Sequence, residues 1–295
     1  QVTIVPDLAS PFVIVLGTAQ DGGTPQAGCH CRFCRAAISA PHRRRLPASL
    51  GIVDPVSGQR WIIDATPAFP EQLRRLDEAA EADATAPLDG ILLTHAHAGH
   101  YTGLLQLGPE AMASESLPVW VMPRMAGFLH GNEPWKQLIE QRHIELRALQ
   151  ADEPVALNER LAIIPLAVPH RDEYSETVAF EVEGPDGRVL WLPDIDSWDA
   201  WDDSLEARID RYQAAWIDGT FHDDSELPGR DRGEIPHPTI TESLERFGRL
   251  STEQAAKLRF MHLNHSNPAA DPDSAAAAAV QAAGMHVAAE GERWE

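Results

Sequence analysis

Three histidines lie within six residues of one another in the segment LLTHAHAGHYTGL, residues 92–104: His95, His97 and His100. Imidazole is a common ligand of zinc, iron, manganese and cobalt ions. His95 and His97 are two positions apart, so in extended backbone they point to the same side, and His100 can reach back from the segment that follows. The spacing therefore predicts a metal site. A carboxylate usually completes such a site, yet the residue before His100 is Gly99.

Other potential ligands lie at the ends of apolar runs elsewhere in the chain. His170 ends AVPH, and His262 and His265 lie in MHLNH. Asp194 in WLPDID can be a bridging metal ligand or the N-cap of a following helix, and Asp196 competes for either role. Strands that lie side by side bring the loops at their ends together and hold them rigidly, so we expect several of these side chains to converge.

The three cysteines of the chain, Cys29, Cys31 and Cys34, all lie in the short segment GCHCRFC. An odd number so closely spaced does not suit a disulfide framework. The pattern C-x-C-x-x-C can instead wrap three thiolates around one tetrahedral ion and leave a fourth position for another ligand. Free thiols and a redox function are the alternatives.

Short apolar runs bounded by Gly, Pro or Asp predict the strands that must position these residues. We expect strands at 12–17, 49–54, 60–65, 89–95, 118–123, 161–170, 177–183, 188–193, 214–219 and 258–265. We expect helices near 70–82, 100–108, 124–131, 134–142, 200–212, 239–248, 252–257 and 272–283. Thr239 followed by Glu242 is typical of a capping box. The second and third strands are joined by turn residues at 54–59, as in an antiparallel hairpin. An α/β layered protein with a mixed sheet or sandwich is therefore favoured over strict βαβ alternation.

Length and charge limit the class of protein. A chain of 295 residues, 43% hydrophobic and 23% charged, can bury a substantial core, and we expect one domain over residues 1–295. No apolar run is long enough to predict a membrane span. The formal net charge of −21 repels polyanions, which argues against nucleic acid and favours a small-molecule substrate. The chain begins at Gln1, so a cytoplasmic location and a periplasmic one after removal of a signal peptide both stay open, as do a monomer and a homodimer.

Together these motifs resemble the metallo-β-lactamase superfamily, whose signature H-x-H-x-D-H follows a strand and corresponds here to residues 95–100. His170, Asp194 and a final histidine in MHLNHSNP follow in the order of that family. The segments LGTAQDGGTPQAGCHCRFC and DGTFHDDSELPG resemble the pyrroloquinoline quinone (PQQ) biosynthesis protein B family. That family is grouped with tRNA endonuclease Z and the cyclic phosphodiesterase of the carbon–phosphorus lyase pathway. The resemblance implies a four-layered αββα sandwich of two mixed sheets with outer helices.

The resemblance also implies a centre of one or two zinc, manganese or iron ions. The first ion would be bound by His95, His97 and His170. The second would be bound by His100, Asp194 and His262, with Asp194 bridging the two. In the cyclic phosphodiesterase branch, a structural zinc ion is held by three cysteines and a histidine three residues beyond the last active-site histidine. This implies a structural zinc site of Cys29, Cys31, Cys34 and His265, with His30 as the alternative to His265.

Two departures from the family pattern affect the expected activity. Gly99 stands where the signature has aspartate, so the second ion is expected to bind weakly, to be a different ion or to be absent. The orientation of an attacking hydroxide then falls to Asp194. The PQQ protein B family tends to lack the first two histidines and to keep the Asp-His pair. This chain does the reverse, which implies a relative with a different activity.

The favoured function is metal-dependent hydrolysis of a phosphodiester, ester, lactone or similar bond by water that the metal activates. His222 in TFHDD and His237 in IPHPT are candidates for contact with the substrate or for proton donation, with surface positions as the alternative. Asp218 in WIDG is expected in a turn or as an outer partner of a ligand. Two other functions stay open: an iron-dependent oxygenase or hydroxylase in PQQ-like cofactor biosynthesis, and a non-catalytic protein that binds a metal or another ligand.

Overall fold

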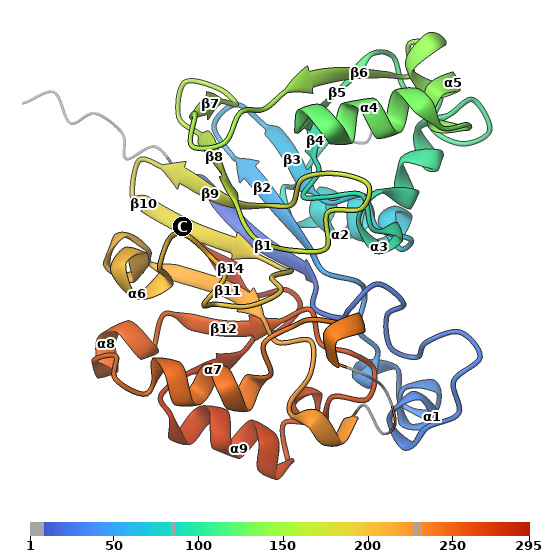
Figure 1. Cartoon of the computed structure of the whole chain (residues 1–295). Coiled ribbons are helices and arrows are strands. Elements are labelled where there is room, and N and C mark those ends of the chain that lie inside the picture. The colour runs from blue at the N-terminus through green and yellow to red at the C-terminus, as the bar shows by residue number, and fades with distance from the viewer. Residues whose placement is uncertain (1–8, 84–85, 227–228, 230–231) are drawn as a thin grey trace, which may run out of the picture.

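The computed structural model describes residues 9–83, 86–226, 229 and 232–295. Two seven-stranded mixed sheets pack face to face, and helices cover the outer side of each (Figure 1). This is the αββα sandwich that the resemblance implied. Residues 1–8 lie outside the described residues, so the full extent of the domain over 1–295 stays a prediction.

The first half of the chain forms the first sheet, except that one edge strand comes from the C-terminal end, and the second half forms the second sheet, as the colours of Figure 1 show. The first sheet has the spatial order β14 (Arg293–Trp294), β1 (Phe12–Gly17), β2 (Ser49–Asp54), β3 (Gln59–Ile63), β4 (Gly90–Leu92), β5 (Leu117–Val121) and β6 (Ile144–Ala148). The second has the order β13 (His286–Val287), β12 (Leu258–Met261), β11 (Ala214–Asp218), β10 (Gly187–Leu192), β9 (Val178–Gly184), β8 (Ala162–Ala167) and β7 (Val155–Ala156).

The α-helices of the described residues are α1 (Arg32–Ser39), α2 (Phe69–Ala79), α3 (Ala98–Tyr101), α4 (Pro123–Gly131), α5 (Trp135–Glu140), α6 (Leu205–Arg208), α7 (Ile240–Phe247), α8 (Thr252–Ala255) and α9 (Ala275–Ala282). Short 3₁₀ helices are η1 (Pro41–Arg43), η2 (Thr102–Leu107), η3 (Ile209–Arg211), η4 (Asp224–Glu226), η5 (Arg232–Glu234) and η6 (Pro268–Ala270). Among these residues, no helix combines the length and the apolar character that a membrane crossing requires.

The alternation of side chains along each strand produces three apolar layers. Trp61 and Ile63 of β3 point between the sheets and pack in one cluster with Trp191 of β10. Ile62, one residue away, points outward and packs with residues of α2 and α4. On the other sheet, Leu190 packs outward with residues of α7 and α9. Because successive residues of a strand face opposite sides, strands apolar on both faces can fill both the central and an outer layer.

Each predicted strand and helical segment has a counterpart in the structure. The expected hairpin joins β2 and β3 as an antiparallel pair, and Thr239 and Glu242 form the expected capping box at the start of α7. Among the α-helices and strands of the described residues, those that the sequence did not reveal are α1, β6, β7, β13 and β14. Three of these strands have only two residues, β6 is a mostly exposed strand at the edge of the sheet, and α1 has a cysteine as its N-cap.

Strand direction explains where functional side chains can meet. In the first sheet β1, β3 and β4 run in the same direction, because β2 is antiparallel to both of its neighbours. In the second sheet β8, β10, β11 and β12 also share one direction. The loops that follow these seven strands therefore lie at one edge of each sheet.

Candidate metal centre

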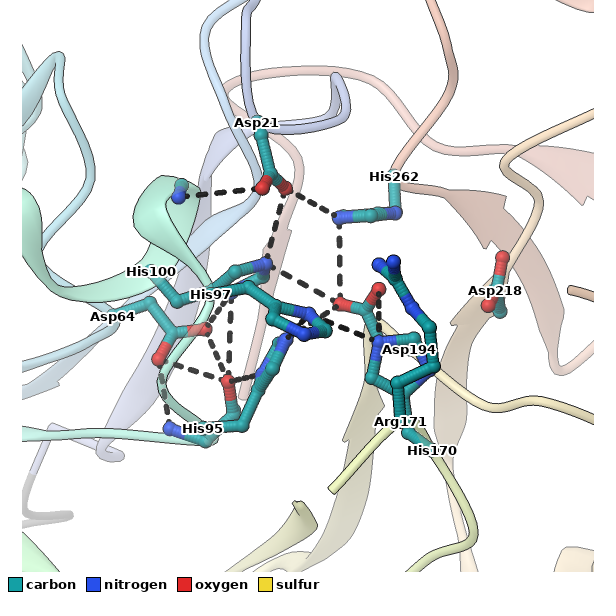
Figure 2. A network of polar contacts seen from close by, with 12 residues as sticks. Asp21, Asp64, His95, His97, His100, His170, Arg171, Asp194, Asp218 and His262 are labelled. Carbon is teal, nitrogen blue, oxygen red and sulfur yellow. Dashed lines mark hydrogen bonds and ion pairs between the residues drawn. The ribbon is translucent and has the colours of Figure 1, made fainter. Parts of the chain in front are cut away.

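Histidines and aspartates from the loops of both sheets converge at this edge (Figure 2). The first sheet contributes Asp21 after β1, Asp64 after β3, and His95, His97 and His100 after β4. The second sheet contributes His170 after β8, Asp194 after β10, Asp218 at the end of β11, and His262 after β12; His237 precedes α7. The cluster thus lies between the two halves of the chain.

Three histidines form the first group. His97 Nδ1 lies 2.9 Å from His95 Nε2 and 3.1 Å from His170 Nε2. All three ligand atoms lie within 4.8 Å of one another. His95 and His170 are almost fully buried. Three imidazole nitrogens that face one point form the ligand set of a catalytic zinc-type site with an open position.

The second group contains two histidines and an aspartate that the sequence analysis did not include. Asp21 Oδ1 lies 3.3 Å from His100 Nε2 and 3.4 Å from His262 Nε2. Ligand atoms about 2.0–2.1 Å from a tetrahedral ion are about 3.3–3.4 Å apart. The spacing in the structure therefore fits donors arranged around one ion.

Asp194 lies between the two groups. Its Oδ2 is 3.3 Å from both His100 Nε2 and His262 Nε2, and 4.0 Å from His95 Nε2. Its Oδ1 is 3.5 Å from His170 Nε2. One carboxylate therefore faces both groups, which is the geometry of a bridging ligand.

Buried polar atoms that make no hydrogen bond show that the second group fits a cation. Within the described part of the chain, His100 Nε2, His262 Nε2 and Asp194 Oδ2 are buried and make no hydrogen bond. A buried polar atom that lacks a hydrogen bond costs about 1–3 kcal/mol, and the neighbours of these three atoms at 3.3–3.4 Å are one another and Asp21. A metal ion would coordinate all three, so the residues present fit the metal that the fold implies.

A set of outer carboxylates orients the histidines. Asp64 Oδ2 lies 2.7 Å from His100 Nδ1, and Asp196 Oδ1 lies 2.8 Å from His170 Nδ1. Asp218 Oδ2 lies 2.7 Å from His237 Nδ1. A carboxylate on one ring nitrogen fixes the other as the free ligand atom and raises its basicity. Asp196 and Asp218 thus each contact the Nδ1 atom of a histidine of the cluster, and the outer role expected for Asp218 stays a prediction.

Backbone conformation supports the special position of two of these residues. Asp64 has a φ of 65° and His262 a φ of 61°. This left-handed region is uncommon for residues other than glycine and costs about 1–3 kcal/mol. Such conformations gather at functional sites because the surrounding structure holds them in place.

The electrostatics favour the ligand forms of four residues of the cluster, but not that of His100. Burial lowers the pKa of His100, yet Asp64 and Asp21 outweigh it and raise the pKa well above its usual value, so a metal ion would have to displace a proton there. Burial lowers the pKa of His95 well below its usual value and that of His97 to about 4, so both rings are neutral near pH 7. Burial acts in the opposite direction on the carboxyl groups of Asp21 and Asp194, but the neighbouring histidines outweigh it and hold both pKa values below the usual range. Neutral imidazoles and ionised carboxylates are the forms that bind metal ions.

The three cysteines form a separate group with His265. His265 Nδ1 lies 3.5 Å from Cys29 Sγ, 3.6 Å from Cys31 Sγ and 3.5 Å from Cys34 Sγ. Three thiolates and one imidazole around a zinc ion place sulfur and nitrogen about 3.6 Å apart. Burial raises the pKa of the Cys31 thiol, but the backbone N–H of Cys34 and the ring of His265 outweigh it and lower the pKa to about 6. The geometry thus fits a structural zinc ion.

The predicted site residues do not all meet. The structure separates His262, in the centre, from His265, beside the cysteines, and it leaves His30 exposed. His237 lies with His170 and Asp194. His222 belongs to none of these groups and lines a cavity with Arg32 and Phe33 of the α1 segment, so a catalytic role for it stays a prediction.

Sequence reasoning missed Asp21 and Asp64. Both have the signal that identified Asp194, namely an aspartate that closely follows an apolar strand. Asp64 directly follows β3, and Asp21 follows β1 by four residues. The histidine signature points to residue 99 for a carboxylate, whereas the aspartate that the structure places beside Gly99 and His100 lies in a loop 78 residues earlier in the chain.

The sequence of the chain is similar to those of known proteins. Residues 59–263 match the model of a family described as the beta-lactamase superfamily domain. This span includes the residues of the first group, Asp194 and His262, but not Asp21 or the cysteines. The coenzyme PQQ synthesis protein B of Xanthomonas campestris pv. campestris (strain B100) is 26% identical over 306 aligned residues, with 95% of this chain and 98% of the relative covered.

Solved structures share the fold. The Zn(2+)-bound PqqB from Methylobacterium extorquens has a TM-score of 0.80 at 21% sequence identity, and the match covers 96% of this chain and 99% of that one. A diphosphatase from the PhnP family has a TM-score of 0.69 at 23% identity, with 97% of both chains covered. At these identities the likeness establishes the architecture.

Proposed function

Because the chain belongs to the beta-lactamase superfamily, we propose that it is a metal-dependent hydrolase with two ions in its centre and a third, structural zinc ion at the cysteines. The observation that carries this proposal is the position of Asp194, whose two carboxylate oxygens face the two groups of ligands. His95, His97 and His170 would hold one ion. Asp194 would bridge it to the ion of the second group.

When bound, such ions supply Lewis acidity, which makes water a nucleophile near neutral pH and stabilises negative charge on the substrate. The residues of the chain supply position and proton transfer. Asp194 is the carboxylate best placed to orient the attacking water. His237, whose ring Asp218 orients, faces His170 and Asp194 and can donate a proton to the leaving group.

Arg171 favours an anionic substrate. Its side chain is exposed and extends toward Asp194 and His262 in the view of Figure 2. Burial is the main cause of the low pKa of His97, and the positive charge of Arg171 lowers it further. Burial and Arg171 also act to lower the pKa of His237, but Asp218 outweighs them and raises it. A guanidinium group at the edge of a metal centre binds phosphate oxygens well. Among the bonds considered, this supports a phosphodiester over a neutral lactone.

The name of a sequence relative supports a class of substrate. A sequence relative is named coenzyme PQQ synthesis protein B, which supports a small molecule of cofactor biosynthesis as the substrate of this chain. The same name keeps an iron-dependent oxidation as the second candidate, since histidine and carboxylate ligands with open positions also suit Fe(II).

Turnover of bis-p-nitrophenyl phosphate and of a simple lactone, with Zn(II) or Mn(II), tests the proposal. We expect phosphodiester hydrolysis in the wild type and a loss of at least about 10³-fold in His97→Ala, because an electrostatic group of the centre is removed. His130→Ala, the same change at an exposed histidine of α4, should retain wild-type turnover. Oxygen consumption after Fe(II) loading, without hydrolysis under any condition, would refute the hydrolase proposal and support the oxidative one.

A further inference from the structure

We propose that Asp21 supplies the carboxylate that the family signature carries at position 99, and that Gly99 makes this exchange feasible. The second group would then have a complete ligand set. The inference rests on the metal centre of the proposed function, but it does not depend on which reaction the centre catalyses.

The carboxylate of Asp21 lies where a ligand of the second ion is needed. Its Oδ1 is 3.3 Å from His100 Nε2 and 3.4 Å from His262 Nε2. Asp194 Oδ2 lies at 3.3 Å from the same two nitrogens. The two imidazole nitrogens therefore each have a carboxylate oxygen of Asp21 on one side and one of Asp194 on the other (Figure 2), and imidazole and carboxylate are both ligands that bind zinc.

The backbone at Gly99 takes part in the arrangement. Its N–H donates a hydrogen bond of 3.3 Å to Asp21 Oδ2. The two oxygens of Asp21 thus have different partners, since Oδ1 faces the histidines and Oδ2 is held by the segment that carries His100. This hydrogen bond turns Oδ1 toward the second group.

A side chain at position 99 and the observed position of Asp21 exclude each other. A Cβ atom added to Gly99 would lie 2.3 Å from Cγ, 2.5 Å from Cβ and 2.6 Å from Cα of Asp21. Rotation of the Asp21 side chain could relieve the contact with Cγ, but not the contact with Cα, which belongs to the backbone. An aspartate at 99 would therefore displace the loop that carries Asp21. The space admits a carboxylate from one of the two positions only.

The loop that carries Asp21 is fixed to the strand end that carries His262. Gln20 N–H donates to Leu263 O at 2.9 Å, and Leu263 N–H donates to Thr18 O at 2.9 Å. A turn follows, in which Gly23 N–H donates to Gln20 O at 2.8 Å. Leu263 directly follows His262, and its two backbone partners lie one and three residues before Asp21. Backbone contacts therefore set the position of Asp21 relative to His262.

Zinc content and affinity in four variants test this exchange. Each protein is loaded with Zn(II), freed of excess metal by gel filtration, analysed by mass spectrometry for metal per chain, and titrated with a competing chelator. The wild type should hold three ions. Asp21→Ala should hold two, with affinity for the lost ion reduced more than about 100-fold, since outer partners of ligands alone are worth about 10–100-fold. Asp21→Asn, which keeps the shape without the charge, should also bind the third ion more weakly.

The exchange itself is tested by moving the carboxylate. Gly99→Asp alone should lose the third ion, because the new side chain and Asp21 compete for one space. The double variant Asp21→Gly with Gly99→Asp removes the contacts with Cγ and Cβ of residue 21, and glycine gives the backbone there the freedom to move away from the remaining contact with Cα. It should therefore regain the third ion, with circular dichroism confirming that both proteins are folded. Three ions of wild-type affinity in Asp21→Ala would overturn the inference. A wild type that binds only the ion of the cysteines would instead refute the metal centre of the proposed function.

Discussion

Replacement of Asp194 by alanine is expected to remove both ions of the centre and to lower turnover at least about 10³-fold, the upper range for a single electrostatic group of an active site. Asp194 is 3% exposed, and its carboxylate faces nitrogens of His100, His170 and His262. Without it, both groups lose a negative charge that balances the charge of the ions. Metal analysis and turnover of the phosphodiester probe, measured on the same samples, check this prediction.

A matched control is Asp196→Asn. Asp196 lies two residues from Asp194 and contacts the ring of His170 at Nδ1, away from the ligand atom. Because Asp196 is only an outer partner of His170, its replacement should weaken metal binding at the centre by about 10–100-fold. It should leave the ion of the cysteines in place. Wild-type metal content and turnover in Asp194→Ala would contradict a bridging role for this residue.

The second large effect is expected from Cys31→Ser. This change removes a thiolate from the group of Cys29, Cys34 and His265 but keeps a cap on α1, because a serine hydroxyl at position 31 can accept the hydrogen bond that Cys31 Sγ accepts from Cys34 N–H. We expect loss of the structural ion and a decrease of about 3 kcal/mol in the free energy of unfolding, in the range for loss of a buried structural element. Thermal unfolding and zinc content measure both effects.

Cys31→Ser should also weaken metal binding in the active centre. The cysteine segment follows the loop of Asp21, and His265 follows His262 by three residues, so an ion held by the cysteines and His265 would tie together the two segments that carry Asp21 and His262. The second ion should therefore bind more weakly in Cys31→Ser, while the ion of His95, His97 and His170 should be retained. His30→Ala, in the exposed residue between two of the cysteines, is the control and should keep all ions. Unchanged stability and zinc content in Cys31→Ser would show that the cysteines hold no metal.

The sequence revealed the elements of the fold because buried strands have a strong local signal. Strands such as β8 and β10 are short apolar runs flanked by turn residues. They could be recognised without knowing which strands pair with them. The exposed edge strand β6, with Glu145 and Arg147 among its residues, lacks this signal because only one of its faces is partly buried. Two-residue strands have no period that a sequence pattern could show.

The candidate site was predictable where ligands follow a pattern within one segment, as His95, His97 and His100 do. The role of Asp21 was not predictable in this way. It depends on the path of a loop, on hydrogen bonds to Leu263 and on the space beside Gly99, all of which arise from contacts between distant parts of the chain. Gly99, taken from the sequence as the loss of a ligand, lies in the structure directly against Asp21, whose carboxylate we propose as the replacement.

Anomalous diffraction from crystals of the Zn(II)-loaded protein, recorded on both sides of the zinc absorption edge, tests the central claim most directly. The account predicts three peaks per chain. One lies among the cysteines and His265, one among His95, His97 and His170, and one among Asp21, His100 and His262, with Asp194 between the last two. A single peak at the cysteines, with none between the two sheets' histidines, would contradict it.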